Sequence, residues 1–137
     1  MAWTDGPLIV YHGTDSDAAS AIKRRIDLSL SQPFTDFGTG FYTTTSFWQA
    51  QNWANERCRR INIGRVAASQ VRAAVVEFKA DRPDFDSRSL LVFILEDSNS
   101  DYWDFVEHCR LGHGAHRPKT KGTYDVVFGP VSLWKQW

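Results

Sequence analysis

The residues with the clearest chemical potential fall in two short stretches of the N-terminal third. The first reads Tyr-His-Gly-Thr at residues 11–14, and the second reads Asp-Phe-Gly-Thr-Gly-Phe-Tyr-Thr-Thr-Thr at residues 36–45. Each stretch combines glycine, which lets a ligand approach the backbone closely, with aromatic rings that offer flat stacking surfaces. Imidazole and hydroxyl groups add hydrogen-bond donors and acceptors. The combination predicts a binding site for a planar, polar ligand.

The composition limits the class of protein. A chain of 137 residues fits one domain with a substantial core. Its 16 basic and 16 acidic residues give zero net charge, whereas proteins that bind nucleic acid through phosphates usually carry a basic excess. Two cysteines are too few for a disulfide framework and fit reduced thiols. We find no membrane-spanning run and no signal peptide, so we expect a cytoplasmic protein without a membrane partner, with export by other routes left open.

Local patterns predict the elements that position the two stretches. An apolar run at residues 8–11 predicts a buried strand that leads into the first stretch, and Asp15 or Ser16 can cap a short helix at residues 18–23. Residues 26–30 alternate between apolar and polar, as an edge strand or a loop would. The glycines of the second stretch predict a loop, followed by a strand at residues 40–44.

Helical spacing of apolar residues predicts a helix at residues 47–61, with Ser46 as its N-cap. Taken alone, this pattern makes Trp53 a core residue of the helix. Strands and helices follow one another without a regular strand–helix–strand rhythm, which favours an α+β fold over a doubly wound one. The elements predicted for the second half are a strand at 71–79, a strand or buried helix at 90–95, a helix from 100 or 101 with Trp103, Phe105, Val106 and Cys109 facing inward, a loop at 112–122 and a strand at 124–130.

Taken together with Gln-Ala-Gln-Asn-Trp-Ala at residues 49–54, the two stretches resemble the ADP-ribosyltransferase superfamily. The chain looks closest to a bacterial and fungal group with a DFGxGFYxT signature, and it resembles the His-Tyr-Glu branch that includes diphtheria toxin and the poly(ADP-ribose) polymerases. The resemblance implies two packed, mostly antiparallel sheets flanked by helices, in a single domain over residues 1–137 that lacks the C-terminal strand expected of the family. It also implies NAD as the substrate, no metal, and a macromolecular acceptor, protein sooner than nucleic acid.

The resemblance assigns roles to individual residues. His12 matches the family histidine that hydrogen-bonds a ribose hydroxyl of NAD, and Tyr42 matches the tyrosine that stacks on the nicotinamide ring. Trp53 lies eleven residues after Tyr42 and matches a second aromatic that covers the same ring. Backbone and hydroxyl groups of the same motifs are implied to bind the nicotinamide amide and the rest of NAD. These binding candidates are Gly13, Thr14, Gly40, Thr45 and Ser46.

The third catalytic position departs from the family pattern. Cleavage of the bond between nicotinamide and ribose passes through an oxocarbenium-like transition state, which calls for a carboxylate or a polar substitute. The family places Glu, Gln or Asp on a late strand, but no Glu follows Glu107. Gln136 and Asp125 are the two candidates, and Asp125 is equally well explained as a structural carboxylate. Three functions therefore stay open: ADP-ribose transfer, NAD hydrolysis, and NAD or nucleotide binding without chemistry.

Three further interpretations carry less weight. The histidines and the cysteine at residues 108–116 lack the spacing of an ordered zinc site and favour a polar loop. Arg57, Arg59 and Arg60, together with the basic residues at 23–25, could bind the NAD pyrophosphate or an acidic partner, although a solvated helix face explains them more simply. An RNA 2′-phosphotransferase with the same fold would need a basic groove, and zero net charge argues against it.

Overall fold

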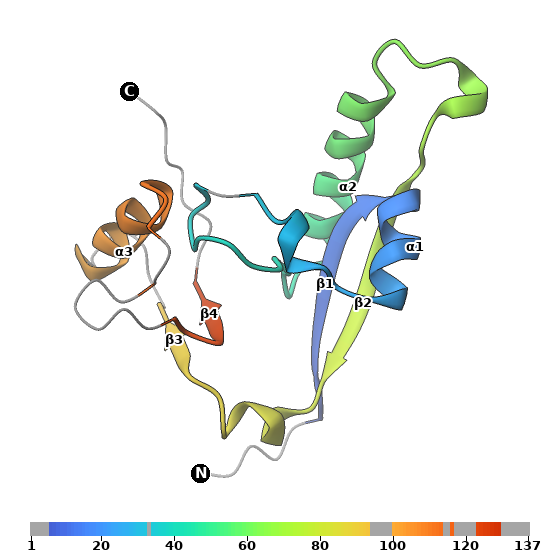
Figure 1. Cartoon of the computed structure of the whole chain (residues 1–137). Coiled ribbons are helices and arrows are strands. Elements are labelled where there is room, and N and C mark those ends of the chain that lie inside the picture. Colours follow the sequence, from blue (N-terminus) through green and yellow to red (C-terminus); the bar gives the residue numbers. More distant parts are fainter. Residues whose placement is uncertain (1–5, 33, 94–99, 114–115, 117–122, 130–137) are drawn as a thin grey trace. The chain divides into compact units, whose positions relative to one another are not determined.

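The computed structural model describes residues 6–32, 34–93, 100–113, 116 and 123–129. Within these residues the chain is α+β, with helices α1 to α3 and two small sheets (Figure 1), so the α+β part of the prediction is confirmed. The chain divides into two units. The first comprises Met1–Asp27 and Phe41–Arg82, and the second comprises Leu28–Gly40 and Pro83–Trp137. Each unit is described by itself.

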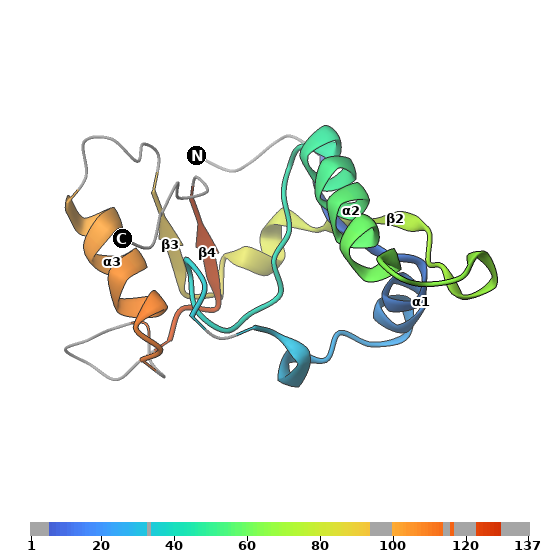
Figure 2. The same ribbon diagram turned by 90° about the horizontal axis from the view of Figure 1, so that it is seen from above.

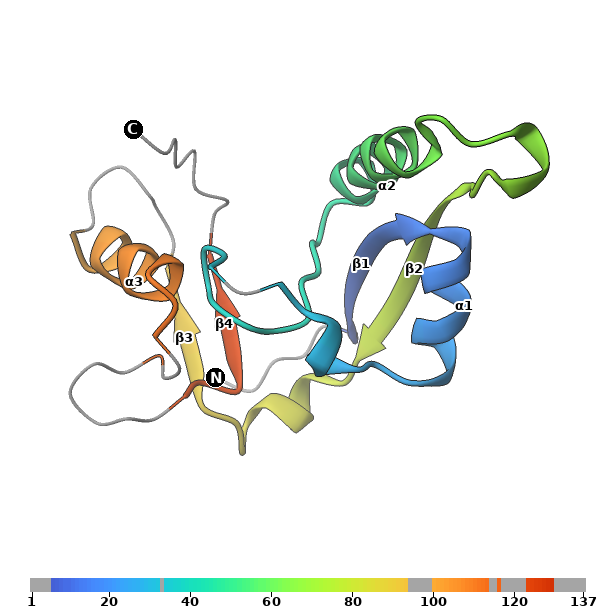
Figure 3. The same ribbon diagram turned by 45° about the horizontal axis from the view of Figure 1, so that its top comes forward.

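The first unit is built on an antiparallel pair of strands. β1 (Leu8–Asp15) pairs with β2 (Ala73–Ala80) along its whole length, with Leu8 opposite Ala80 and Asp15 opposite Ala73 (Figure 3). Both predicted strands are confirmed. β1 is longer than predicted, because it continues through His-Gly-Thr to Asp15. The first chemical stretch therefore lies inside the strand and not in a turn after it.

On its other edge β1 makes one short contact with the second stretch. The Tyr11 backbone donates to the Thr44 carbonyl oxygen at 2.7 Å, and the Thr44 backbone donates to the Tyr11 carbonyl oxygen at 2.8 Å. Residues 41–43 have no regular secondary structure, so the predicted strand at 40–44 is wrong beyond this single bridge. Pairing ends there because the Ser46 backbone donates to the Thr44 hydroxyl at 3.1 Å, which turns the chain into the next helix.

Two capped helices pack against this sheet (Figures 1 and 2). α1 (Ser16–Arg24) has Asp15 as its N-cap, and the Asp15 side chain accepts from two backbone N–H groups of the first turn. α2 (Phe47–Asn62) has Ser46 as its N-cap, and the Ser46 hydroxyl accepts from the Gln49 backbone at 3.2 Å. Both predicted helices and both predicted caps are confirmed.

Small residues make the buried stripe of α2. Ala50, Ala54 and Cys58 are buried at four-residue spacing, while the Trp53 side chain is 41% exposed. The interpretation of Trp53 as a core residue is therefore wrong: the stripe of small residues lets α2 sit close to the sheet and leaves no depth for an indole. Beyond α2, the Asn62 side chain accepts from the Val71 backbone at 2.8 Å and donates to its carbonyl at 2.9 Å, which closes the connection to β2.

The second unit contains a parallel pair. β3 (Leu90–Val92) lies beside β4 (Val126–Phe128), with Leu90 opposite Val126 (Figure 3). α3 (Ser100–Arg110) lies between them in the sequence, as the long connection between parallel strands requires. This pair differs from the expected mostly antiparallel sheets and forms a strand–helix–strand unit that the sequence pattern did not predict.

Aromatic residues form the core of the second unit. The buried cluster consists of Phe93, Tyr102, Phe105, Val106 and Cys109, and Trp103 is only partly buried beside it. Of the two alternatives for residues 26–30, an edge strand or a loop, the structure excludes the strand and shows a short 3-10 helix from Leu28. Three short 3-10 helices complete the described elements: η1 (Leu28–Leu30), η2 (Ala67–Ser69) and η3 (Arg82–Phe85).

Some predictions fall outside the described residues. They concern Gln136, Pro130, residues 94–95 and most of the loop at 112–122. Among the helices that the structure does describe, none has both the length and the apolar character needed to cross a membrane.

Candidate functional site

β1 presents alternate residues to α2. The Tyr11 ring lies edge-on to Phe47 with centroids 5.4 Å apart, and Arg57 Nε donates to Asp15 Oδ2 at 2.8 Å. Gly13, between them, faces the same helix. Because strand side chains alternate, the even-numbered residues of β1 project from the other face of the sheet.

His12 lies on that other face and meets the second stretch. Its Nδ1 donates to the Tyr42 carbonyl oxygen at 2.6 Å, and its ring stacks on Phe41 with centroids 4.4 Å apart and planes at 25°. Phe41 in turn makes an edge contact with Phe78 of β2 at 5.6 Å. The His and Tyr motifs, thirty residues apart in sequence, are thus in direct contact within the first unit.

The hydrogen bond to Tyr42 fixes the tautomer of the neutral imidazole. A carbonyl oxygen can only accept, so Nδ1 carries a hydrogen, and in the neutral ring Nε2 offers a lone pair. Burial is the main cause that lowers the pKa of His12; the Tyr42 carbonyl opposes it and the charge of Arg57 adds to it. No described residue hydrogen-bonds Nε2. A neutral His12 can therefore accept a hydrogen bond from a ligand hydroxyl.

Gly13 allows the closest approach of helix and strand. A Cβ built at this position would lie 2.8 Å from the carbonyl carbon of Ala50 and closer still to its oxygen, well inside the 3.4 Å of ordinary contact. Only glycine fits here without moving the backbone of α2. The first turns of α2 are consequently held directly beside the centre of β1.

The backbone of Gly13 also lies on an open edge. Tyr11 directs its N–H and C=O away from β2 toward Thr44. Backbone groups alternate in an antiparallel strand, so those of Gly13 point toward the same edge. Among the described residues, none hydrogen-bonds them on that side. One donor and one acceptor at adjacent positions match the two polar groups of a carboxamide.

The turn beside this edge is held by a relay of hydroxyls. The Thr44 hydroxyl donates to the Gln49 side-chain oxygen and accepts from the Ser46 backbone, while the Ser46 hydroxyl accepts from the Gln49 backbone. This is a capping box in which Thr44 stands between the glutamine and the N-cap backbone. The Ser46 oxygen therefore serves the helix, and no described residue accepts its hydroxyl hydrogen. Thr45 is exposed beside it.

Thr14 and Trp53 complete the candidates of the first unit. Thr14 is buried at 3% exposure, within the sheet. Trp53 is half-exposed on α2 and makes no ring contact with another described residue. Because α2 covers the face of β1 opposite to His12, the predicted sandwich of one ligand ring between Tyr42 and Trp53 stays a prediction.

The remaining candidates belong to the second unit or lie outside the described residues. Gly40 has open space around its Cα, and Gln136 is not described. Asp125 Oδ2 accepts from the Ser89 backbone at 2.8 Å, and the Asp125 backbone donates to the Ser89 carbonyl at 2.9 Å. These bonds join the residues that directly precede β3 and β4, which favours the interpretation of Asp125 as a structural carboxylate.

The Asp-Phe-Gly part of the second stretch is anchored within the second unit. Arg110 donates to Asp36 from Nε at 2.7 Å and also from Nη2. His116 Nε2 donates to the Phe37 carbonyl at 2.9 Å, while its Nδ1 accepts from the Tyr124 backbone at 3.0 Å. The two ends of the second stretch thus have separate tasks: residues 36–38 hold the second unit, and residues 41–44 contact β1.

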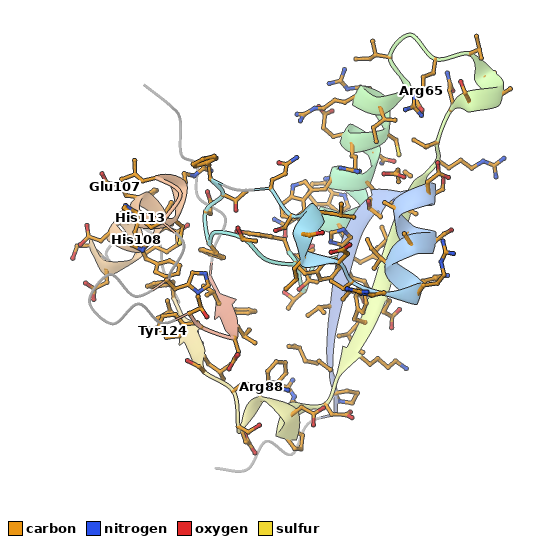
Figure 4. The ribbon with its side chains drawn as sticks, viewed as in Figure 1. Arg65, Arg88, Glu107, His108, His113 and Tyr124 are labelled. Carbon is orange, nitrogen blue, oxygen red and sulfur yellow. The ribbon has the colours of Figure 1, made fainter. Side chains whose placement is uncertain are left out.

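Both cysteines are buried free thiols. Burial and, after it, the charge of Asp36 raise the pKa of Cys109 to about 11, and burial is the main cause that raises the pKa of Cys58. His108 and His113 stack with centroids 4.4 Å apart and planes at 10° (Figure 4). The described residues contain no group of three or more His, Cys, Asp or Glu side chains that could hold a metal.

Sequence reasoning missed the ion pair between Asp15 and Arg57. The sequence identifies Asp15 as a helix cap, but 42 residues separate the partners and no local pattern links them. Their position on facing elements emerges only when α2 packs over β1.

Fold and site together define a small α+β protein with an open strand edge beside a neutral histidine. The chain belongs to a family described as protein of unknown function (DUF3990), whose model matches residues 8–133. No curated protein and no solved structure matches the chain.

Proposed function

We propose that this protein binds NAD at the open edge of β1 and transfers its ADP-ribose to a macromolecular acceptor. The observation that carries the proposal is the contact between His12 and Tyr42, whose motifs resemble those of the ADP-ribosyltransferase superfamily. The 2.6 Å hydrogen bond brings the two residues together in one unit.

The nicotinamide and its ribose have candidate partners on the first unit. The nicotinamide amide would bind the N–H and C=O of Gly13, which point toward the open edge. The Nε2 lone pair of His12 would accept from a ribose hydroxyl. Tyr42 and Trp53 would supply aromatic surface for the cationic ring. The exposed fraction of Trp53, 41%, supports a role other than core packing.

The reaction breaks one bond and forms another at the same carbon, the ribose C1. The bond from the ribose C1 to the nicotinamide nitrogen breaks, and nicotinamide leaves with the bonding electrons. The acceptor nucleophile then forms a bond to C1 and loses its proton. Positive charge that develops on the ribose must be stabilised, and the family resemblance alone names Gln136 and Asp125 as candidates for that task.

Two alternatives remain proposals of the same site. Water as the acceptor would make the protein an NAD glycohydrolase. One observation favours a binding module without chemistry: the Asp125 carboxylate accepts a hydrogen bond from the Ser89 backbone. A carboxylate that links the starts of two strands is less available to contact a ligand.

Calorimetry with NAD and a nicotinamide-release assay test the proposal together. We expect His12→Ala and Tyr42→Ala to weaken NAD binding and abolish release, whereas His113→Ala, a change to an exposed histidine of the second unit, leaves both unchanged. Binding without release would select the binding module. The proposal is wrong if the wild-type chain gives no heat with NAD.

A further inference from the structure

We infer that Arg57 is the anion-binding residue of the β1 edge and that it takes the diphosphate group of the ligand. The identity of that ligand as a dinucleotide rests on the proposed function. The diphosphate chemistry itself rests on how Arg57 is held, on which arginines are already paired, and on where Arg57 lies relative to Gly13.

Arg57 is fixed at one end and open at the other. Its Nε donates to Asp15 Oδ2 at 2.8 Å, yet its side chain remains 50% exposed while that of Asp15 is 6% exposed. Neither Nη group hydrogen-bonds any described residue. A guanidinium is planar, so a bond at Nε leaves the terminal nitrogens as a pair of donors in a defined direction.

Hydrogen bonds to both of its oxygens hold the Asp15 carboxylate in one orientation. Its Oδ1 accepts from the backbones of Asp17 at 3.0 Å and Ala18 at 2.9 Å, while Oδ2 holds Arg57. The same carboxylate therefore caps α1 and orients a residue of α2. An arginine held this way loses little freedom on binding phosphate, and its paired donors suit a phosphate oxygen pair.

The neighbouring arginines of α2 are committed elsewhere. Arg59 donates from Nε and Nη2 to the two carboxylate oxygens of Glu56 at 3.0 and 2.8 Å, and Arg60 Nε donates to Glu56 at 2.9 Å. These pairs lie on the exposed face of the helix. Arg57 alone of the three is held against β1, which distinguishes it from the solvated helix face that the sequence pattern also allowed.

The position of Arg57 fits a ligand that extends along the edge. Its partner Asp15 lies two residues beyond Gly13 in β1, and Trp53 precedes Arg57 by one helical turn, about 6 Å of rise. A ring-stacking residue and a phosphate-binding residue therefore follow each other on α2. Burial is the main cause that lowers the pKa of His12, and the charge of Arg57 adds to it.

Calorimetry on the full chain with separate probes tests the assignment: ADP, inorganic pyrophosphate and nicotinamide. We expect Arg57→Gln to weaken ADP and pyrophosphate binding by about tenfold or more, since charge-assisted bonds to phosphate are lost, and to leave nicotinamide binding unchanged. Arg57→Lys should recover only part of the affinity, because an ammonium keeps the charge without the paired donors. Arg60→Gln is the matched control, with the same charge change on the same helix, and should stay within twofold of the wild type.

The outcomes separate this inference from the proposed function. ADP binding that depends on Arg57, without nicotinamide release from NAD, would support the anion site while the proposed function fails. Equal ADP affinity in Arg57→Gln and Arg60→Gln would overturn the assignment, as would a wild-type chain that binds neither ADP nor pyrophosphate. If Arg57→Gln does not fold, a competition experiment on the wild-type chain takes its place. Pyrophosphate is then expected to displace bound ADP, and a failure to displace it overturns the inference.

Discussion

Replacing Gly13 with alanine is the most direct test of how β1 and α2 create the site. The added methyl group would lie 2.8 Å from the Ala50 carbonyl carbon and 3.1 Å from its Cα. These atoms belong to the helix backbone, so no side-chain rotation can relieve the overlap. Either α2 must move away from β1, or the strand must bend at the point where its edge is open.

The cost follows from the kind of atom that is displaced. Overpacking a well-fitted contact usually costs 1–3 kcal/mol, and a rigid helix backbone places Gly13→Ala in the middle of that range or above it, at about 2 kcal/mol. For a unit of roughly 70 residues, each kcal/mol lowers the unfolding midpoint by about 4–8 °C. We therefore expect the first unit to melt about 10 °C lower in Gly13→Ala.

Thermal unfolding followed by circular dichroism measures the effect, and Gly6→Ala provides the matched control. Gly6 has no atom within 4 Å of a built Cβ, so alanine there should change the midpoint by no more than a few degrees. NAD binding should weaken in Gly13→Ala alone. Equal midpoints for the two variants would refute the close approach of α2 to β1 from which the site is built.

Three further predictions address the histidine, the helix cap and the buried thiol. The folded pKa of His12 lies below its ordinary 6.5, so the unfolded chain binds more protons than the folded one as the pH falls through that value, and the wild type loses stability. In urea titrations between about pH 7 and 5, His12→Gln should therefore lose less stability than the wild type. An equal loss would contradict the buried neutral ring. Ser46→Ala should cost about 1 kcal/mol of unfolding free energy by the same titrations, and no loss would mean that the hydroxyl does not cap α2. Cys109, with its pKa raised to about 11, should resist a thiol reagent at about pH 8 until the protein is unfolded, and fast labelling of the native chain would contradict its burial.

Local chemistry made the helices of the first unit predictable. Asp15 and Ser46 are N-cap residues placed directly before segments of helical character, and each accepts the backbone hydrogen bonds that the cap role requires. The strand ahead of His12 was likewise visible as an apolar run. Where one stretch of sequence contains both the element and its boundary signal, the sequence was sufficient.

Features that depend on distant partners were not predictable. The run from 40 to 44 has strand propensity, but the Thr44 and Ser46 hydrogen bonds turn the chain before a ladder can extend. Trp53 has helical core spacing, yet Gly13 lets α2 approach so closely that only small residues fit between helix and sheet. The parallel pairing of β3 and β4 likewise depends on a connection that periodicity does not encode.

For the candidate site, the motifs identified His12 and Tyr42 but not the reason for their contact. The structure brings them together through the backbone carbonyl of Tyr42, so any residue at position 42 could make that bond. The identity of the Tyr42 side chain is therefore not required for this hydrogen bond. A substitution such as Tyr42→Leu should keep the His12 hydrogen bond, and a loss of ligand binding in that variant would come from the ring.

The site depends on an uninterrupted register between β1 and β2. Four residues of β1 have different roles. Tyr11 pairs with Thr44 at the edge of the strand, and His12 projects from one face. On the other face, Gly13 allows the close approach of α2, and Asp15 orients Arg57. Because side chains alternate with period two, a shift of one residue would turn the histidine toward α2 and the close-packed glycine away from it. All eight residues of β1 are paired without a bulge. The ladder with β2, which carries none of the candidate residues, is thus what sorts them between the two faces and the edge.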